Sequence, residues 1–236
     1  MKIFLDADEL AAIQKRPRFE KFRAYRYTFL FIAILAQFIL VPLLEEVAGS
    51  LVPLVFILVV FGVLGTLGLH KRFLYFSLGL GIAAIVTHYL GRLLYAEGAS
   101  HPYLFLLGLS LDIVFLLLVV VILMFKVFSE DKITGETIKG GISVYFLLGF
   151  LWSYVYLLVL FLDPGAISFP APIQRLSTIT YFSFTTLTTL GYGDITPASW
   201  MARNLTILES TMGPIFLTVL IARLVGLHVV SKSKSS

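Results

Sequence analysis

The amino-acid sequence predicts an all-α membrane protein with six transmembrane helices, on the strength of its composition, the lengths of its apolar segments and the placement of its basic residues. Of the 236 residues, 58% are hydrophobic and 14% are charged, and the mean hydropathy is +0.95. A soluble domain of this length is far more polar. The chain is therefore expected to lie in a lipid bilayer.

Six segments are long enough to cross a membrane as helices. A helix needs roughly 20 apolar residues to span a hydrocarbon core of about 30 Å, because its backbone groups must pair within the helix. The predicted spans are residues 27–44, 51–69, 73–95, 103–128, 141–162 and 204–230. A further segment, residues 172–188, is too polar to cross alone, so we predict a re-entrant helix with Pro172 in its first turn.

Lysine and arginine residues predict the orientation of these spans, since short cytoplasmic loops retain them. The leader, residues 1–26, carries seven of them. If the leader is cytoplasmic and six spans alternate, fifteen of the eighteen basic residues lie inside. We therefore expect a multi-pass plasma-membrane protein with both termini in the cytoplasm, typical of a prokaryotic inner membrane.

The leader itself is not a secretory signal peptide, because Asp6, Asp8 and Glu9 interrupt its apolar start. Two interpretations remain open for it. It is either a solvated tail that sets the topology, or a short interfacial helix followed by a basic cluster that is attracted to anionic lipid.

Enzymatic chemistry has no support in the sequence. Without cysteine, the chain uses neither disulfides nor thiol chemistry. We find no phosphate-binding loop, no metal-ligand cluster and no nucleophile with a paired base, so we expect no enzymatic cofactor and no nucleic-acid partner.

The most informative motif follows the re-entrant segment: residues 189–194 read Thr-Leu-Gly-Tyr-Gly-Asp. A dehydrated cation needs several oxygens around it at once, and four such strands would supply stacked rings of backbone carbonyls. Gly191 and Gly193 alternate with larger residues and can take positive φ without a Cβ clash, which aims successive carbonyls at one axis. The C-terminal end of the preceding helix carries roughly half a negative charge and favours a cation there.

The larger residues of this motif have different expected roles. The side chains of Leu190 and Tyr192 should point away from the axis and pack behind the strand, where they hold the diameter of the ring. The Thr189 hydroxyl should add a further oxygen ligand, and Asp194 should close the outer end with negative charge.

In its order of outer helix, short helix, glycine-rich strand and inner helix, the segment 141–230 resembles the tetrameric potassium-channel superfamily, and residues 181–197 resemble the pore signature of its prokaryotic and two-pore-domain members. The resemblance implies passive, K⁺-selective conduction by a homotetramer, since this chain has one filter motif and such a pore needs four. The ion-binding residues would be Thr189, Leu190, Gly191, Tyr192 and Gly193. The resemblance does not extend specifically to the first 128 residues.

Three residues near the filter depart from the family pattern. Many members carry two tryptophans where this chain has Tyr181 and Phe182, so the indole hydrogen bond that braces the filter tyrosine is missing. Some bacterial relatives place a glutamate where Thr185 stands. We expect Phe182, Thr185, Asp194 and Glu209 to support the filter.

The inner helix contains a predicted hinge. Gly213 lies nineteen residues after Asp194, the offset at which the resembling channels place the glycine about which the helix bends, and Pro214 removes a helical hydrogen bond. The alternative is that Gly213 permits close helix packing. Glu209 lies one turn earlier, where a carboxylate facing lipid would be costly, so we expect it to face protein near the filter.

The first four spans, residues 27–128, form a unit that resembles a voltage sensor without gating charges. The only charged residues of the fourth span are Asp112 and Lys126. Moving one charge through the field yields about 2.3 kcal/mol per 100 mV, and steep gating uses three or four charges per subunit. We therefore predict weak or absent voltage dependence. Residues 129–140 form a cytoplasmic linker, predicted as a helix along the inner membrane face, and residues 231–236 form a short tail.

A polar cluster is expected in the outer half of this unit. His88 and Arg92 are four residues apart and share a helix face, and Asp112 should meet one of them. The cluster is either a structural clasp between two helices or a proton-sensitive switch, since histidine titrates near neutrality.

Two rival functions follow from the same residues. A potassium-uptake transporter subunit usually fuses four degenerate pore repeats with a single glycine each, whereas this chain has one intact repeat. A non-conducting partner that modulates another channel is the second rival, and it leaves the intact filter without a use.

Overall fold

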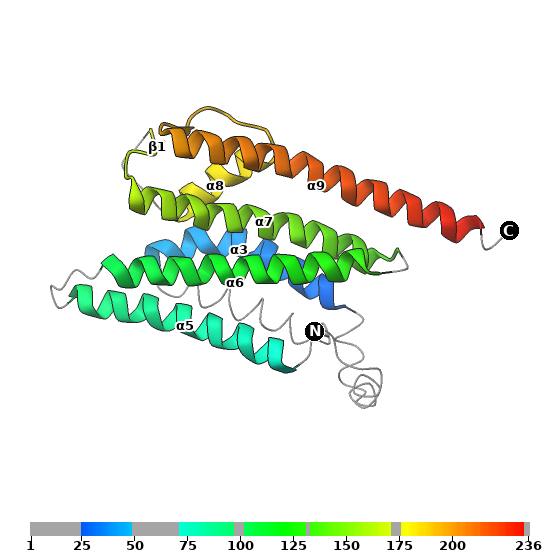
Figure 1. Ribbon diagram of the computed structural model, residues 1–236, viewed down its shortest axis with the longest axis horizontal. Helices are drawn as coiled ribbons and strands as arrows, with labels where there is room; N and C mark the ends of the chain where they lie inside the picture. Colours follow the sequence, from blue (N-terminus) through cyan, green and yellow to red (C-terminus); the bar gives the residue numbers. More distant parts are fainter. Residues whose placement is uncertain (1–24, 49–70, 97–101, 131–132, 171–175, 234–236) are drawn as a thin grey trace.

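The computed structural model describes residues 25–48, 71–96, 102–130, 133–170 and 176–233. The described part is helical apart from two short strands (Figure 1). Its helices are α3 (Arg26–Ala48), α5 (Lys71–Ala96), α6 (Pro102–Phe128), α7 (Gly135–Leu162), α8 (Leu176–Leu187) and α9 (Trp200–Ser233). The strands are β1 (Ile167–Ser168) and β2 (Thr196–Pro197).

Five of these helices lie where apolar segments predicted membrane spans, while the predicted span at residues 51–69 lies outside the described residues. Within the described part, three helices are long and apolar enough to cross a membrane: Pro102–Phe128, Gly135–Leu162 and Trp200–Leu227. Helices α3 and α5 contain shorter apolar stretches, Arg26–Leu40 and Tyr75–Thr87. The described chain therefore fits a helical membrane protein.

Helix α7 is the centre of the packing, since α3, α6, α8 and α9 all contact it. Helix α5 lies against α6, α6 lies against α7, and α3 packs on another side of α7. Helix α8 is held between α7 and α9 at the end of the molecule where β1 lies (Figure 1). The largest buried side chains of this arrangement include Tyr27, Phe115, Leu147 and Tyr156.

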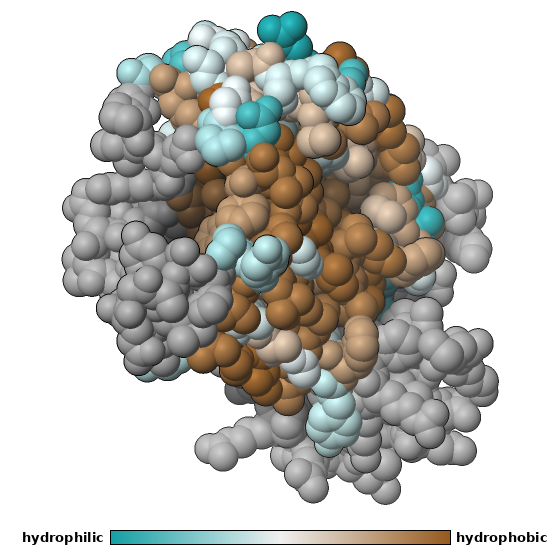
Figure 2. Space-filling model, turned by 60° about the vertical axis from the view of Figure 1, so that its left-hand side comes forward, coloured by the Kyte–Doolittle hydropathy of each residue, from teal (hydrophilic) through white to brown (hydrophobic). Residues whose placement is uncertain are grey.

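The outer surface of the bundle is apolar. Figure 2 shows a broad hydrophobic surface, with hydrophilic residues gathered mainly at one end. Exposed large apolar side chains come from α3, α5, α6 and α9, among them Ile39, Tyr75, Phe125 and Ile207. A surface of this kind requires lipid or further protein to cover it.

The connection between α6 and α7 differs from the prediction. Helix α7 begins at Gly135, within the predicted linker, so residues 135–139 form its first turns and not a separate helix along the membrane face. Thr134 caps it: the Thr134 hydroxyl accepts a bond from the amide of Thr137, and the Thr137 side chain accepts one from the amide of Thr134. Gly140 lets α7 approach α6 and α3, since a Cβ there would lie 2.9 Å from a Val127 methyl and 3.1 Å from the Tyr27 ring.

Two glutamates at this end tie α3 to the α6–α7 connection. The Glu136 carboxylate accepts bonds from the backbone amides of Tyr27 (3.0 Å) and Thr28 (3.1 Å), so it satisfies donors in the first turn of α3. The Glu130 carboxylate forms an ion pair with Arg26. Its backbone carbonyl also accepts from Arg223 of α9 at 3.3 Å, which links this connection to the inner helix.

At the opposite end, β1 pairs with β2 in an antiparallel register that matches Ile167 with Pro197. The Ala166 carbonyl accepts from the amides of Ala198 (2.8 Å) and Ser199 (3.1 Å). The Ser199 hydroxyl then accepts from the amide of Ala202 at 3.1 Å and caps the start of α9. These bonds fasten the segment after the glycine-rich motif, residues 189–194, to the loop that follows α7.

Candidate functional site

Helix α8 positions the glycine-rich strand, the segment of residues 189–193, which is separate from β1 and β2. It lies within the predicted re-entrant segment, and its contact with α7 is close because Gly149 has no side chain: a Cβ there would lie 2.4 Å from the Phe184 ring. The hydroxyls of Thr185 and Thr186 donate to the Phe182 carbonyl at 3.0 and 2.9 Å. These threonines thus bond within their own helix, and the helix ends where the strand starts.

The strand has the alternating backbone that the glycines predicted, extended by one residue. Gly191 and Gly193 have positive φ of 51° and 82°, and Thr189 has φ of 59°. Leu190 and Tyr192, between them, do not have positive φ. Gly191 donates its amide to the Thr185 carbonyl at 3.0 Å, which ties the strand to the last turn of α8.

A tyrosine braces the outer end of the strand in place of an indole. The Tyr181 hydroxyl donates to the Asp194 carboxylate at 2.8 Å, and the Tyr181 ring stacks on Tyr192 with centroids 6.4 Å apart and an interplanar angle of 5°. The hydrogen bond raises the pKa of the Tyr181 phenol, because the bond requires the phenolic proton. The indole hydrogen bond that the sequence lacks is therefore replaced by the hydrogen bond from Tyr181 to Asp194.

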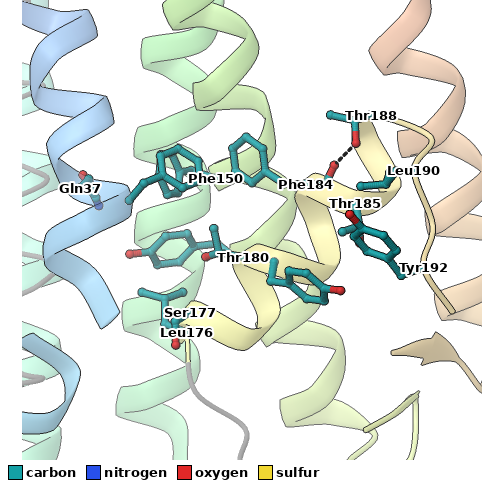
Figure 3. Close-up of a pocket in the computed structure, with 13 residues that line it drawn as sticks. Gln37, Phe150, Leu176, Ser177, Thr180, Phe184, Thr185, Thr188, Leu190 and Tyr192 are labelled. Carbon is teal, nitrogen blue, oxygen red and sulfur yellow. Dashed lines mark hydrogen bonds between the residues drawn. The ribbon is translucent and has the colours of Figure 1, made fainter. Parts of the chain in front are cut away.

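Behind the strand lies a mostly apolar cavity of about 410 Å³ (Figure 3). Leu190 and Tyr192 line it from the strand, Phe150 from α7 and Gln37 from α3. In the single chain, Leu190 is 54% and Tyr192 68% exposed, so the cavity is open on this side. Whether these two side chains pack behind the strand in an assembly stays a prediction.

The inner helix touches the end of α8 at Gly213. A Cβ at this position would lie 2.0 Å from the Leu187 carbonyl oxygen, so no other residue fits without displacement of the backbone. The same carbonyl accepts a bond from the Tyr145 hydroxyl at 3.3 Å. This geometry fits the close-packing interpretation of Gly213. Pro214 lies within α9, which is helical on both sides of it.

Glu209 lies where it was expected, facing protein next to α8. It is fully buried, its Oε2 accepts from the Tyr156 hydroxyl at 2.6 Å, and its Oε1 lies 2.6 Å from the Ser183 hydroxyl. Phe182 is buried beside this group, with its ring edge-on to Tyr156 at 5.0 Å between centroids. The three helices α7, α8 and α9 meet at this carboxyl group.

Within the described residues, one stripe of α9 packs against the rest of its own chain. The buried residues Ala202, Glu209, Gly213, Phe216 and Leu220 recur at helical spacing along it. Apolar residues such as Ile207, Leu208 and Ile215 on the remaining surface are 57–61% exposed.

The polar cluster expected in the outer half can be followed at only one of its members. Asp112 is buried in α6, with 4% of its surface exposed. The side chains of His88 and Arg92 lie outside the described residues, so the predicted pairing stays a prediction.

Three residues of the site were missed by sequence reasoning. Tyr156 and Ser183 hold Glu209, and Tyr145 contacts the end of α8. Each of the three carries a hydroxyl group within an apolar segment, which was the available sign of a buried polar contact. The periodicity of the sequence does not predict which buried groups of different helices are in contact.

Comparison with known proteins adds one finding. Residues 113–228 match the family model described as ion channel. The match supports an ion-channel family. It begins within α6, contains α7, α8 and the strand, and ends in α9, so it contains most of the segment 141–230. No curated protein and no solved structure matches the chain.

With three membrane-length helices in its described part, the chain therefore fits a helical membrane ion channel. The match suggests transport of an ion rather than enzymatic chemistry. The strand at residues 189–193 and the helix that precedes it lie inside the ion-channel match.

Proposed function

We propose that the chain forms a homotetrameric, potassium-selective channel that conducts passively and is not gated by a charged fourth helix. The pore would be built from α7, α8, the strand and α9. The permeant ion would bind the carbonyls of Thr189, Leu190, Gly191 and Tyr192, with Gly193 closing the strand.

One observation carries this proposal: the regular alternation of positive φ at Thr189, Gly191 and Gly193. L-residues rarely adopt this conformation, and a threonine held there costs roughly 1–3 kcal/mol. An alternation of this kind has a use when a row of carbonyls must replace the hydration shell of a cation.

A four-fold assembly would explain why the strand, the cavity and much of α9 are exposed in the single chain. One strand provides one quarter of each oxygen ring, and it is exposed in the single chain. The strand backs onto the open cavity, and most of α9 lacks a covering partner within the described chain. Neighbouring protomers would cover part of both, and lipid the rest, which includes anionic lipid at the basic leader.

Purified protein reconstituted in liposomes tests this function. With a K⁺ gradient we expect a reversal potential close to the K⁺ equilibrium value, and only a small shift when Na⁺ is added. The current should depend weakly on voltage, since α6 carries only Asp112 and Lys126 as charged residues. Equal passage of Na⁺ would contradict selectivity.

The two rival functions give different results in the same vesicles. A transporter subunit would show saturating flux coupled to a second ion. A modulatory subunit would show no flux alone although it is folded. As a control, Gly191→Ala puts a Cβ on a residue with φ of 51°, and we expect this variant to lose K⁺ flux while α7 and α9 stay folded.

A further inference from the structure

The Ser183 hydroxyl, next to Glu209, lies within hydrogen-bond distance of two oxygen atoms. The Ser183 Oγ lies 2.6 Å from Glu209 Oε1 and 2.8 Å from the carbonyl oxygen of Gly149. The Ser183 hydroxyl has a single hydrogen. It can therefore donate fully to only one of these two oxygens.

The number of hydrogens on these groups decides which group must donate for every contact to be a hydrogen bond. The Gly149 carbonyl carries no hydrogen, so Ser183 must donate to it for that contact to be a bond. The contact between Ser183 and Glu209 is then a bond only if the carboxyl group donates. The remaining Glu209 oxygen accepts from the Tyr156 hydroxyl.

We propose that Glu209 is a neutral carboxylic acid that donates its proton to Ser183, and that this bond positions the pore helix α8 against the inner helix α9. An ionised carboxylate would turn the Ser183 hydroxyl towards itself. It would leave the Ser183 oxygen facing the Gly149 carbonyl oxygen at 2.8 Å without a hydrogen between them. A buried acid that stays neutral in order to donate is a known device of protein sites.

The surroundings of the carboxyl group support the neutral form. Helix α7 contributes the Tyr156 and Tyr145 phenols, and Tyr145 is within electrostatic reach of Glu209. Helix α8 contains no Lys, Arg, His, Asp or Glu, and the nearest basic residues of α9 are Arg203 and Arg223, well along the helix in either direction. Within the described residues no cation pairs with Glu209, and a buried charge without a partner is costly.

Helices α8 and α9 meet at two points that are one helical turn apart, and the bond lies at the first of them. On α8, Ser183 is followed four residues later by Leu187, and on α9, Glu209 is followed four residues later by Gly213. Ser183 meets Glu209, and the Leu187 carbonyl meets Gly213. The bond that depends on the Glu209 proton thus joins α8 to α9. The separation of these two helices would set the position of the strand. This role rests on the proposed channel function, whereas the proton itself does not.

Infrared difference spectroscopy tests the proton without any ion flux. A protonated carboxyl group has a carbonyl stretch that is separate from the carboxylate bands. In wild-type protein minus Glu209→Gln, both in lipid at neutral pH, we expect one protonated-acid band that disappears on alkaline titration. A carboxylate band in its place would overturn the proposal.

Ion flux tests the positioning role. Glutamine keeps both bonds, because its amide donates to Ser183 and its carbonyl accepts from Tyr156. We therefore expect Glu209→Gln to keep flux within about twofold of wild type at neutral pH, well below the tenfold effect expected from one lost buried bond of about 1.4 kcal/mol. Wild-type flux should fall as pH rises through the ionisation of Glu209, whereas the flux of Glu209→Gln should not.

A matched control separates this bond from general packing. The Ser153 hydroxyl also donates to the Gly149 carbonyl, at 2.8 Å, but it does not contact Glu209. Ser153→Ala should keep the alkaline fall in flux, and Ser183→Ala should lose the helix contact and reduce flux by about tenfold, the size of one buried hydrogen bond. An alkaline fall that persists in Glu209→Gln would overturn the positioning role. Absence of K⁺ flux from wild type would overturn the channel proposal and leave the infrared result standing.

Discussion

The absence of a side chain at Gly213 sets how closely the inner helix approaches the pore helix. The Leu187 carbonyl oxygen occupies the place of the missing Cβ, at 2.0 Å from its ideal position. This contact lies at the C-terminal end of α8, where the last carbonyls of a helix carry partial negative charge. A single residue therefore controls where that charge lies relative to α9.

Gly213→Ala should disrupt this contact. The added methyl group cannot be accommodated by rotation of a flexible side chain, because the atom it meets belongs to the backbone. We expect a loss of about 1–3 kcal/mol in unfolding free energy, the usual cost of overpacking, together with reduced K⁺ flux. Thermal unfolding in detergent micelles measures the first effect.

Gly226→Ala is the matched control, since Gly226 also lies in α9 and a Cβ there meets nothing within 4 Å in the single chain. It should be neutral or slightly stabilising, because alanine favours a helix over glycine. Equal stability of the two alanine variants would show that the Leu187 contact is unimportant.

The phenol of Tyr181 provides a test by pH. Its pKa is raised in the folded protein above the usual value of 10.0 by the bond to Asp194. The stabilisation by this bond is therefore complete below about pH 10 and is lost as pH rises through the raised pKa. We expect wild-type protein to be more stable than Tyr181→Phe at neutral pH, and the difference to vanish in strong alkali. Melting temperatures of both proteins across this range decide the matter; a difference that stays constant with pH would contradict the assignment.

At the scale of whole helices, hydropathy predicted where α3, α5, α6, α7 and α9 lie, because each is a long apolar run that must satisfy its own backbone. It did not predict the start of α7, which depends on the polar cap at Thr134 and not on apolar content. The glycine pattern predicted positive φ at Gly191 and Gly193 but not at Thr189, since side-chain sterics disfavour it there.

Contacts between helices were harder to predict than the helices. Glu209 meets residues 26 and 53 positions away in sequence, and no local pattern reports such a meeting. Only the cost of an unpaired carboxylate in lipid indicated that Glu209 would face protein.

The first turn of α3 depends on a glutamate from another helix. Glu136→Ala should leave the amides of Tyr27 and Thr28 without this acceptor and should lower the unfolding free energy by about 2 kcal/mol. Glu130→Ala, which removes an ion pair of partly exposed side chains, should cost less than about 1 kcal/mol. Denaturant titration in micelles compares the two, and an equal cost would contradict the capping role of Glu136.

On the scale of the whole molecule, the peripheral helices pack on the pore helices of their own chain. Both α3 and α6 contact α7, and only residues 129–134 separate α6 from α7. In the proposed tetramer, this arrangement predicts that α3 and α6 of one protomer pack on α7 of the same protomer and do not reach across to a neighbour.

A cysteine pair tests this arrangement, because the natural sequence contains no cysteine. Val127 of α6 and Gly140 of α7 lie close enough that a Cβ at Gly140 would be 2.9 Å from the Val127 side chain. On oxidation, Val127→Cys combined with Gly140→Cys should form a disulfide within one chain and migrate as a monomer under denaturing, non-reducing conditions. A ladder of cross-linked dimers and larger species would show that the helices are exchanged between protomers; each single variant serves as the control.

The short connection between α6 and α7 has a consequence for cooperativity. In the proposed tetramer, a stimulus felt by the peripheral helices of one protomer would be passed to α7 of that protomer alone. In a ring of four, these peripheral helices would respond independently, and concerted opening would have to arise at the centre, where the four inner helices converge.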